Sequence, residues 1–305
     1  MLKLNVEAAK STLEERDFPN DVIFETTTIC NLKCVMCPQG KIRRIGKVMD
    51  IETFKKGARE IANESSETRI WFAQMGEALE APDNLISMIE YAKALGHHNL
   101  HLNTNGGLLT KDISRRLVES GVSNVYFGLD AFDAETYDKI RCEGDYDYTV
   151  KAIGDFLDIN RASGGPVDVA VQFIVMDENA ASVEAFKDYW LGRGAIVKVR
   201  PRLGWGDAYD SDSLYLKEDD RNYPCPWLIR VMQIQVDGTV IQCGGDWDGL
   251  YPLANIRDKT LKSVWNNELK EIRSRHWSLD FSKKPCCDCK DWQTGRSYYY
   301  TGEPG

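Results

Sequence analysis

Three cysteines lie close together near the start of the chain, in the segment TTTICNLKCVMCPQG. Cys30, Cys34 and Cys37 follow a predicted strand over 21–27, and no histidine lies near them. A structural zinc site closes with four ligands, usually paired as two short CxxC knuckles. Three thiolates in one loop can instead bind three irons of a four-iron cluster and leave the last iron open. The spacing therefore favours an iron–sulfur centre, with zinc as the alternative.

A second group of cysteines lies in the last third of the chain. Cys225 and Cys243 flank a predicted hairpin, with Gly238 five residues before Cys243, and Cys286 and Cys289 follow as a CxxC pair. Four thiolates from a hairpin and a knuckle could hold zinc, and on their chemistry alone zinc would be the first choice.

The composition limits the classes of function that the chain can have. Its 305 residues and 43% hydrophobic content can bury a full core. A net charge of -9 argues against nonspecific binding to nucleic acid or anionic membranes. No apolar stretch approaches the roughly 18–20 residues of a membrane span, and the charged N-terminal segment lacks a signal-peptide pattern. We expect a soluble, cytoplasmic protein whose nine cysteines bind metal rather than form disulfides.

The first two thirds of the chain alternate strand-like and helix-like segments. Strands are predicted at 21–27, 68–73, 99–104, 123–130, 167–175 and 195–201. Helices are predicted at 51–63, 82–95, 111–120, 148–161 and 181–191. Six β/α repeats predict a parallel sheet covered by helices and are too few for a closed eight-stranded barrel. The expected fold class is α/β, an open, partial (β/α)6 barrel with its chemistry at the carboxyl ends of the strands.

Polar and glycine-rich segments follow the predicted strands. QMGEALE follows the second strand, NTNGG the third and LDAFD the fourth. Together with the first cysteine loop, these segments should meet at one rim of the barrel.

The alternation ends near residue 203. We predict an N-terminal extension over 1–20, the barrel over 21–202, a linker over 203–215 and a smaller module over 216–305. In that module, residues 230–243 are predicted as a hairpin that turns at Asp237-Gly238, and 259–275 as a helix.

The CxxxCxxC spacing, in a loop after the first strand of a β/α barrel, resembles the radical S-adenosylmethionine (SAM) superfamily. The resemblance implies that SAM chelates the open iron and is cleaved reductively to a 5′-deoxyadenosyl radical, which abstracts a substrate hydrogen. The segment Met75-Gly76-Glu77-Ala78 keeps the central Gly-Glu of the family's Gly-Gly-Glu-Pro motif, and Met36 stands where an aromatic residue is common. By the same resemblance, the residues expected to bind SAM are Gln74, Gly76, Glu77, Asn105, Gly128 and Arg141.

The C-terminal cysteines resemble the twitch module, a shortened SPASM domain. The resemblance implies one auxiliary four-iron cluster held by Cys225, Cys243, Cys286 and Cys289. Cys287 could replace one of the last two, but the CxxC spacing favours the outer pair.

The resemblance fixes the initiating chemistry and leaves the substrate open. We expect a two-electron oxidation of a small polar metabolite, such as a sugar or aminocyclitol, with the auxiliary cluster as electron acceptor and a flavodoxin or ferredoxin as electron donor. Epimerisation with Cys142 as hydrogen-atom donor, with Cys287 as a second candidate donor, is the first alternative. The others are a peptide-modifying maturase and a zinc-binding structural protein.

Two further sets of residues are candidates for the substrate site. Lys198, Arg200 and Arg202 alternate along the sixth strand, so they share one face and could bind a phosphate or carboxylate, unless they pair with surface acids. The candidate bases for a hydroxyl proton are Glu77, Asp130, Asp246 and Asp248.

Overall fold

The computed structural model describes residues 13–44, 46–206, 208–209, 222–289, 291 and 298–301. All six predicted barrel strands are present: β1 (Asp21–Phe24), β3 (Arg69–Phe72), β4 (Leu100–Thr104), β5 (Asn124–Gly128), β7 (Asp168–Val175) and β8 (Ile196–Pro201). Each pairs in parallel with the next. The predicted α/β partial barrel is therefore confirmed.

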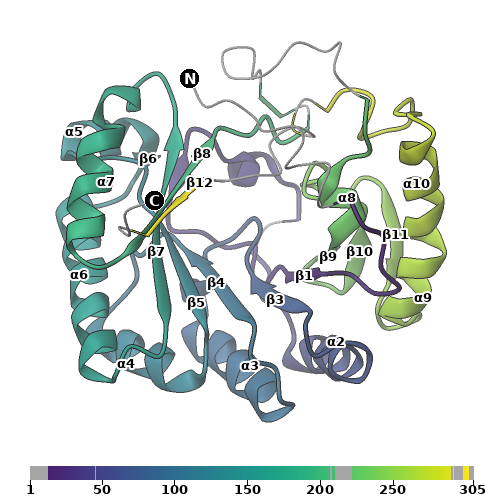
Figure 1. The fold of residues 1–305 in the computed structure, drawn as a ribbon, viewed down its shortest axis with the longest axis horizontal. Helices are drawn as coiled ribbons and strands as arrows, with labels where there is room; N and C mark the ends of the chain where they lie inside the picture. The colour runs from purple at the N-terminus through teal and green to yellow at the C-terminus, as the bar shows by residue number, and fades with distance from the viewer. Residues whose placement is uncertain are drawn as a thin grey trace.

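Helices cover the outer face of this sheet, as Figure 1 shows. They are α2 (Ile51–Glu64), α3 (Pro82–Ala94), α4 (Lys111–Ser120), α5 (Ala134–Ile140), α6 (Tyr146–Ala162) and α7 (Val183–Gly192). Side-chain caps begin several of them, including Asp50 on α2 and Thr110 on α4. Of these helices, only α5 was not predicted from the sequence.

Alternation along the strands places apolar side chains on the outer face, under the helices, and a mixture of aromatic, polar and apolar side chains in the interior. Val22 and Phe24 of β1 are fully buried in the main hydrophobic core. Trp71, His101 and Tyr126 lie within ring contact of one another, on three consecutive strands. The inward side chains of the barrel are thus aromatic and polar, with apolar ones such as Ile23 among them, a mixture that suits a ligand-binding interior.

The C-terminal hairpin continues the barrel sheet. Its first strand, β9 (Val231–Ile234), pairs in parallel with β1, and β10 (Thr239–Ile241) pairs antiparallel with β9. Two strands that were not predicted complete the sheet: β11 (Pro252–Asn255) beside β10 and β12 (Tyr298–Tyr300) antiparallel to β8. The full order is β11-β10-β9-β1-β3-β4-β5-β7-β8-β12. Cys225 and Cys243 of the second cysteine group therefore flank an extension of the barrel sheet.

Short elements complete the chain. They are β2 (Lys33–Cys34), β6 (Arg141–Cys142), α8 (Pro226–Arg230) and the 3-10 turns η1 (Pro38–Lys41), η2 (Ala78–Glu80) and η3 (Ala180–Ser182). The helix predicted over 259–275 is two helices, α9 (Leu261–Asn266) and α10 (Glu268–Trp277). They meet at Asn267, whose backbone is not helical and whose side chain donates to the carbonyl of Ser263.

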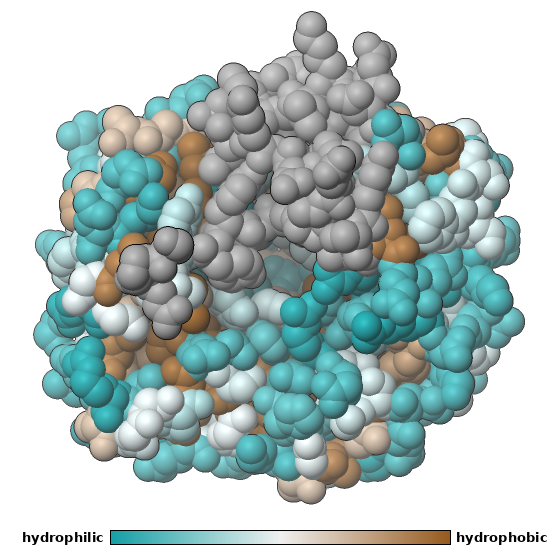
Figure 2. All heavy atoms as spheres, in the orientation of Figure 1, coloured by the Kyte–Doolittle hydropathy of each residue, from teal (hydrophilic) through white to brown (hydrophobic). Residues whose placement is uncertain are grey.

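The described surface in Figure 2 is mixed, with hydrophobic residues scattered among hydrophilic ones. Among the described residues, no helix combines the length and apolar character needed to cross a membrane.

Candidate active site: two cysteine groups on one cavity

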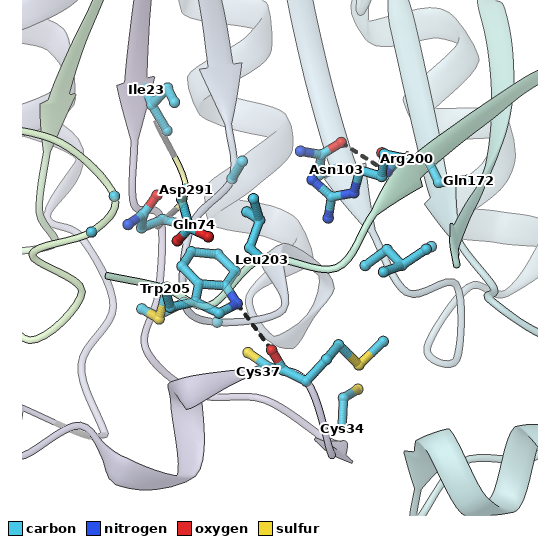
Figure 3. A pocket seen from close by; sticks show the side chains of 18 of the residues that line it. Ile23, Cys34, Cys37, Gln74, Asn103, Gln172, Arg200, Leu203, Trp205 and Asp291 are labelled. Atoms are coloured by element: carbon cyan, nitrogen blue, oxygen red, sulfur yellow. Dashed lines mark hydrogen bonds between the residues drawn. The ribbon is translucent and has the colours of Figure 1, made fainter. Parts of the chain in front are cut away.

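Both cysteine groups border one cavity of about 280 Å³ at the carboxyl ends of the barrel strands. Its lining includes Cys30, Cys34 and Cys37 from the first group, and Cys225, Cys243 and Cys289 from the second. Figure 3 shows Gln74 and Asp291 on one side of this space, and Asn103, Gln172 and Arg200 on the other. The fold therefore joins two groups of cysteines that lie about two hundred residues apart in sequence.

The first cysteine loop pairs with β6, and its three cysteines are half-buried. Cys34 lies in β2, which pairs with β6, and the backbone of Cys34 is opposite Arg141. Burial raises the pKa of the Cys30 thiol to about 12 and that of Cys37 to about 11. Without a cation these thiols stay protonated, whereas metal ions bind the thiolate. The loop is suited to iron rather than to free thiolate chemistry.

Arg141 is fixed by a buried carboxylate. Asp130 is fully buried and accepts hydrogen bonds from Nε (3.0 Å) and Nη2 of Arg141. Arg141 Nη1 lies 3.5 Å from Cys34 Sγ. A Cβ added to Gly128 would lie 2.5 Å from Arg141 Nη2, so glycine leaves the space that the guanidinium fills. Asp130, a candidate base, is instead engaged in this ion pair.

Gly76 and Glu77 hold the loop after β3 against the segment after β1 and the end of β4. A Cβ on Gly76 would lie 2.2 Å from the carbonyl oxygen of Thr27, which only glycine avoids. The buried Glu77 carboxylate accepts from the Thr104 hydroxyl (2.6 Å) and from the backbone N–H groups of Asn105 (2.6 Å) and Leu79 (3.0 Å). Burial raises the pKa of Glu77. These hydrogen bonds connect the loop after β3 to the end of β4, so Glu77 has a structural role, although it also borders the cavity.

Two amide side chains that line the cavity, those of Gln74 and Gln233, each have a buried polar atom without a hydrogen-bond partner among the described residues. Gln74 has a φ of 123°, in a region that favours glycine, and Gln233 on β9 is 4% exposed. Among the residues that the structure describes, neither Gln74 Nε2 nor Gln233 Oε1 has a hydrogen-bond partner. Sequence reasoning missed Gln233, although its alternation with the buried Met232 and Ile234 marks it as facing the other side of the strand.

The three basic residues of β8 and its end have different surroundings. Arg200 lines the cavity, close to the hydrogen-bonded pair Asn103 and Gln172. Lys198 is buried, 4.8 Å from the ring centre of Tyr126. Burial, assisted by nearby arginines, lowers the pKa of Lys198 to about 7. The guanidinium of Arg202 lies over the ring of Tyr209, 5.3 Å from its centre. Of the three, only Arg200 borders the cavity in the described structure.

The second cysteine group gathers around Cys243. Burial raises the pKa of Cys243 well above its usual value, and the charges of Cys286, Cys289 and Cys225 add to this effect. Cys286 Sγ lies 3.3 Å from His276 Nε2 and 2.7 Å from Gln242 Nε2. The outer pair of the CxxC thus lies with Cys225 and Cys243.

Cys287 is exposed, and Cys142 is not among the residues that line the cavity. The Cys142 thiol is directed at the carbonyl oxygen of Lys139, 3.8 Å away.

The remaining candidate bases, Asp246 and Asp248, also lie outside the cavity lining. Asp246 accepts from the backbone N–H groups of Leu250 and Tyr251, and Asp248 pairs with Arg43. Both carboxylates therefore hold loops together.

Part of the predicted linker forms a wall of the cavity. Leu203 and Trp205 line it, and the Trp205 indole donates to the carbonyl oxygen of Met36 (2.9 Å; Figure 3). Asp291 also lines the cavity and accepts from the backbone of Gly204. No sequence signal marked Asp291, and residues 207 and 210–215 of the predicted linker lie outside the described residues.

Comparison with known families identifies the class. Residues 24–189 match the radical SAM superfamily, and residues 225–290 match SPASM, an iron–sulfur cluster-binding domain. The chain therefore belongs to the radical SAM superfamily and carries a SPASM or twitch domain at its C-terminus, as predicted.

Among its relatives is the tungsten-containing aldehyde ferredoxin oxidoreductase cofactor-modifying protein of Pyrococcus furiosus, 33% identical over 310 residues, with 87% of this chain and 86% of that protein covered. The mycofactocin maturase MftC of Mycolicibacterium smegmatis is 25% identical over 70% of this chain. The chain spans about half (52%) of the length of that maturase.

Solved structures share the fold at low identity. Streptococcus suis SuiB bound to the precursor peptide SuiA superposes with a TM-score of 0.71 and 14% identity, covering 95% of this chain and 73% of SuiB. BtrN in complex with AdoMet and 2-DOIA gives a TM-score of 0.64 and 16% identity, covering 90% and 93%.

The family implies SAM, a four-iron cluster and an additional iron–sulfur cluster, and the residues present fit these groups. Among the described residues, no three His, Cys, Asp or Glu side chains form a group that could hold a single metal ion. The first three cysteines instead border an open space, which a multi-iron cluster needs. Gly76, Gly128 and Arg141, three of the residues expected to bind SAM, line the same cavity.

Proposed function

We propose that this enzyme oxidises a hydroxyl-bearing carbon of a small polar metabolite by two electrons. One observation carries the proposal: both cysteine groups line the same cavity, so a substrate held there would lie between the two metal centres. Such a substrate can give up a hydrogen atom on one side and an electron on the other.

The bound groups supply one-electron chemistry: SAM with its cluster removes a hydrogen atom from the substrate, and the auxiliary cluster accepts the second electron. The hydroxyl proton leaves to solvent, and the carbon becomes a carbonyl. A small redox protein, a flavodoxin or ferredoxin, is the proposed donor of the electron that starts each cycle.

The cavity side chains suit a substrate with hydroxyl groups. Gln74, Asn103, Gln172 and Gln233 are neutral amides that can each donate and accept hydrogen bonds. Arg200 adds a cationic group that suits a carboxylate or phosphate on the same substrate. The Glu77 carboxylate already accepts hydrogen bonds from Thr104 and Asn105, so it positions the loops around the cavity and is not proposed to bind substrate.

The relatives support a metabolite in two ways. The Pyrococcus furiosus relative, which this chain matches over most of both lengths, is named a cofactor-modifying protein. BtrN, which has a similar fold and size, was crystallised with 2-DOIA. Both point to a small molecule.

A peptide substrate is the second candidate. The observation that favours it is the likeness to SuiB, solved with its precursor peptide, together with the relationship to the mycofactocin maturases. Epimerisation with Cys142 as hydrogen donor has less support, because Cys142 is not among the cavity-lining residues.

Isotope labelling separates these reactions. The reconstituted enzyme is incubated anaerobically in deuterium oxide with SAM, reductant and a panel of sugars, aminocyclitols and linear peptides. Oxidation of a metabolite yields a product two mass units lighter, with no deuterium at the reacting carbon. An inverted carbon carrying one deuterium would indicate epimerisation, and turnover of peptides alone would overturn the metabolite proposal.

A further inference from the structure

A short turn, Leu203–Gly206, lies between the two cysteine groups. We propose that Asp291 is a positioning residue that couples the two metal sites: it holds this turn, and thereby Trp205, against the loop of the first cluster. The inference rests on the assignment of two clusters and does not depend on the substrate or on the reaction.

Both carboxylate oxygens of Asp291 accept hydrogen bonds from the backbone of the turn. Oδ1 accepts from the backbone N–H of Gly204 (2.7 Å) and Oδ2 from that of Gly206 (2.9 Å). The Asp291 backbone N–H lies 3.3 Å from Cys289 Sγ and donates to it. One residue therefore contacts both the auxiliary-cluster cysteines and the turn. Hydrogen bonds to a charged carboxylate are stronger than those between neutral groups, so these two bonds should hold the turn in place.

The turn has a backbone conformation that its surroundings must enforce. Trp205 has a φ of 53° and Gly206 a φ of 72°, both in the left-handed region, which is unusual for tryptophan. A Cβ on Gly206 would lie 2.9 Å from the carbonyl oxygen of Gly245, two residues after Cys243. The turn is thus packed against the second cysteine group as well as bonded to Asp291.

Trp205 of the turn and Tyr209, which follows it, contact the first cluster loop. The Trp205 indole N–H donates to the carbonyl oxygen of Met36 (2.9 Å), and the Tyr209 hydroxyl donates to that of Cys37 (2.9 Å). Figure 3 shows the Trp205 ring spanning from the side of Asp291 toward the cysteine loop. Trp205 also lines the cavity, so the position of the turn shapes the space beside the first cluster.

The consequence is a linkage between the two sites. The auxiliary cluster fixes Cys289, which anchors Asp291 and through it Trp205. Loss of the auxiliary cluster should therefore loosen the turn and weaken SAM binding, even while the first cluster is intact.

The test compares reconstituted Asp291→Ala and Asp291→Asn with wild type. Hydrogen–deuterium exchange is followed in peptides that span 203–206, SAM affinity by equilibrium dialysis, and each cluster by iron content and electron paramagnetic resonance. We expect about tenfold faster exchange and about tenfold weaker SAM binding in Asp291→Ala, with an intermediate effect in Asp291→Asn. Asp280→Asn, a surface site in the same module, is the matched control and should behave as wild type.

Two further variants keep the proposal falsifiable if Asp291→Ala loses its auxiliary cluster. Trp205→Leu retains Asp291 and should weaken SAM binding with both clusters loaded. Cys243→Ala retains the first cluster and should speed exchange at 203–206. Wild-type SAM affinity in Trp205→Leu, or unchanged exchange in Cys243→Ala, would overturn the proposal.

Discussion

Arg141 and Asp130 form a buried ion pair that reaches the first cysteine loop. The Asp130 carboxylate is fully buried and receives two of the guanidinium nitrogens, while the third lies 3.5 Å from Cys34 Sγ. Arg141 lines the cavity, and the pair ties β6 to the segment that follows β5. We therefore expect stability and SAM binding to depend on the same contact.

Removal of Arg141 should substantially lower the free energy of unfolding. In Arg141→Met, Asp130 remains as a buried charge without its guanidinium partner, which typically costs about 3–5 kcal/mol. Anaerobic urea unfolding should show this loss. The matched control is Arg161→Met, which breaks the exposed pair with Asp158 and should cost at most about 1 kcal/mol. Equal losses in the two variants would contradict the role of burial.

The two cysteine groups should have separable functions. Replacing Cys30, Cys34 and Cys37 with Ala removes the proposed ligands of the SAM-binding cluster, so SAM cleavage to 5′-deoxyadenosine should disappear. Cys225→Ala should keep some abortive cleavage and form no product, with iron falling from about eight to about four per chain. Liquid chromatography of the nucleoside products measures both. Full turnover in Cys225→Ala would mean that the auxiliary cluster is only structural.

Gly128→Ala should impair SAM binding through Arg141. The new Cβ would lie 2.5 Å from Arg141 Nη2, so the guanidinium must move from its place beside Asp130. SAM affinity, measured by equilibrium dialysis, should fall by about tenfold or more. Gly192→Ala is the control: it lies at the end of α7 with nothing within 4 Å of the added Cβ, and it should bind SAM normally. Normal affinity in Gly128→Ala would exclude this packing role.

Most of the barrel could be predicted because its signals are local. Alternation set the strands, helical spacing set the helices between them, and the cysteine loop follows β1 directly. The pairing of β9 with β1 could not be predicted, because it joins segments about 210 residues apart and no local pattern encodes it. The same applies to Asp291, whose role depends on the backbone of Gly204 and Gly206.

The directions of two other side chains at the site, Cys142 and Gln233, could have been predicted from the sequence. Arg141 and Cys142 are consecutive residues of one short strand, so their side chains point in opposite directions. Once Arg141 is assigned to the cavity, Cys142 is directed away from it. Gln233 follows from the same alternation, between buried apolar neighbours on β9.

Lys198 should make stability depend on pH. Burial lowers its pKa to about 7, whereas in the unfolded chain it is near 10.5. Between these values the unfolded state binds more protons than the folded state, so the contribution of Lys198 to stability increases as pH rises from about 7 to about 10. Below pH 7 the penalty for burying its charge is complete. A tenfold change in the acid dissociation constant between the two states corresponds to about 1.4 kcal/mol.

Lys198→Met removes this dependence. The variant should be more stable than wild type at pH 7, and the difference between them should shrink toward pH 10. Urea unfolding at pH 7, 8.5 and 9.5 measures the trend. A constant difference across this range would show that Lys198 keeps an ordinary pKa in the folded protein.

Gln233→Leu should separate stability from function. The Gln233 Oε1 atom is buried without a partner among the described residues, which typically costs about 1–3 kcal/mol in the ligand-free protein. Leucine removes that cost, so the variant should be as stable as wild type or more stable in thermal unfolding. If the amide binds substrate, turnover should fall while abortive SAM cleavage continues. Gln172→Leu is the contrast, because it breaks the hydrogen bond to Asn103 and should lower stability. A destabilised Gln233→Leu with unchanged turnover would show that the amide serves the fold and not a ligand.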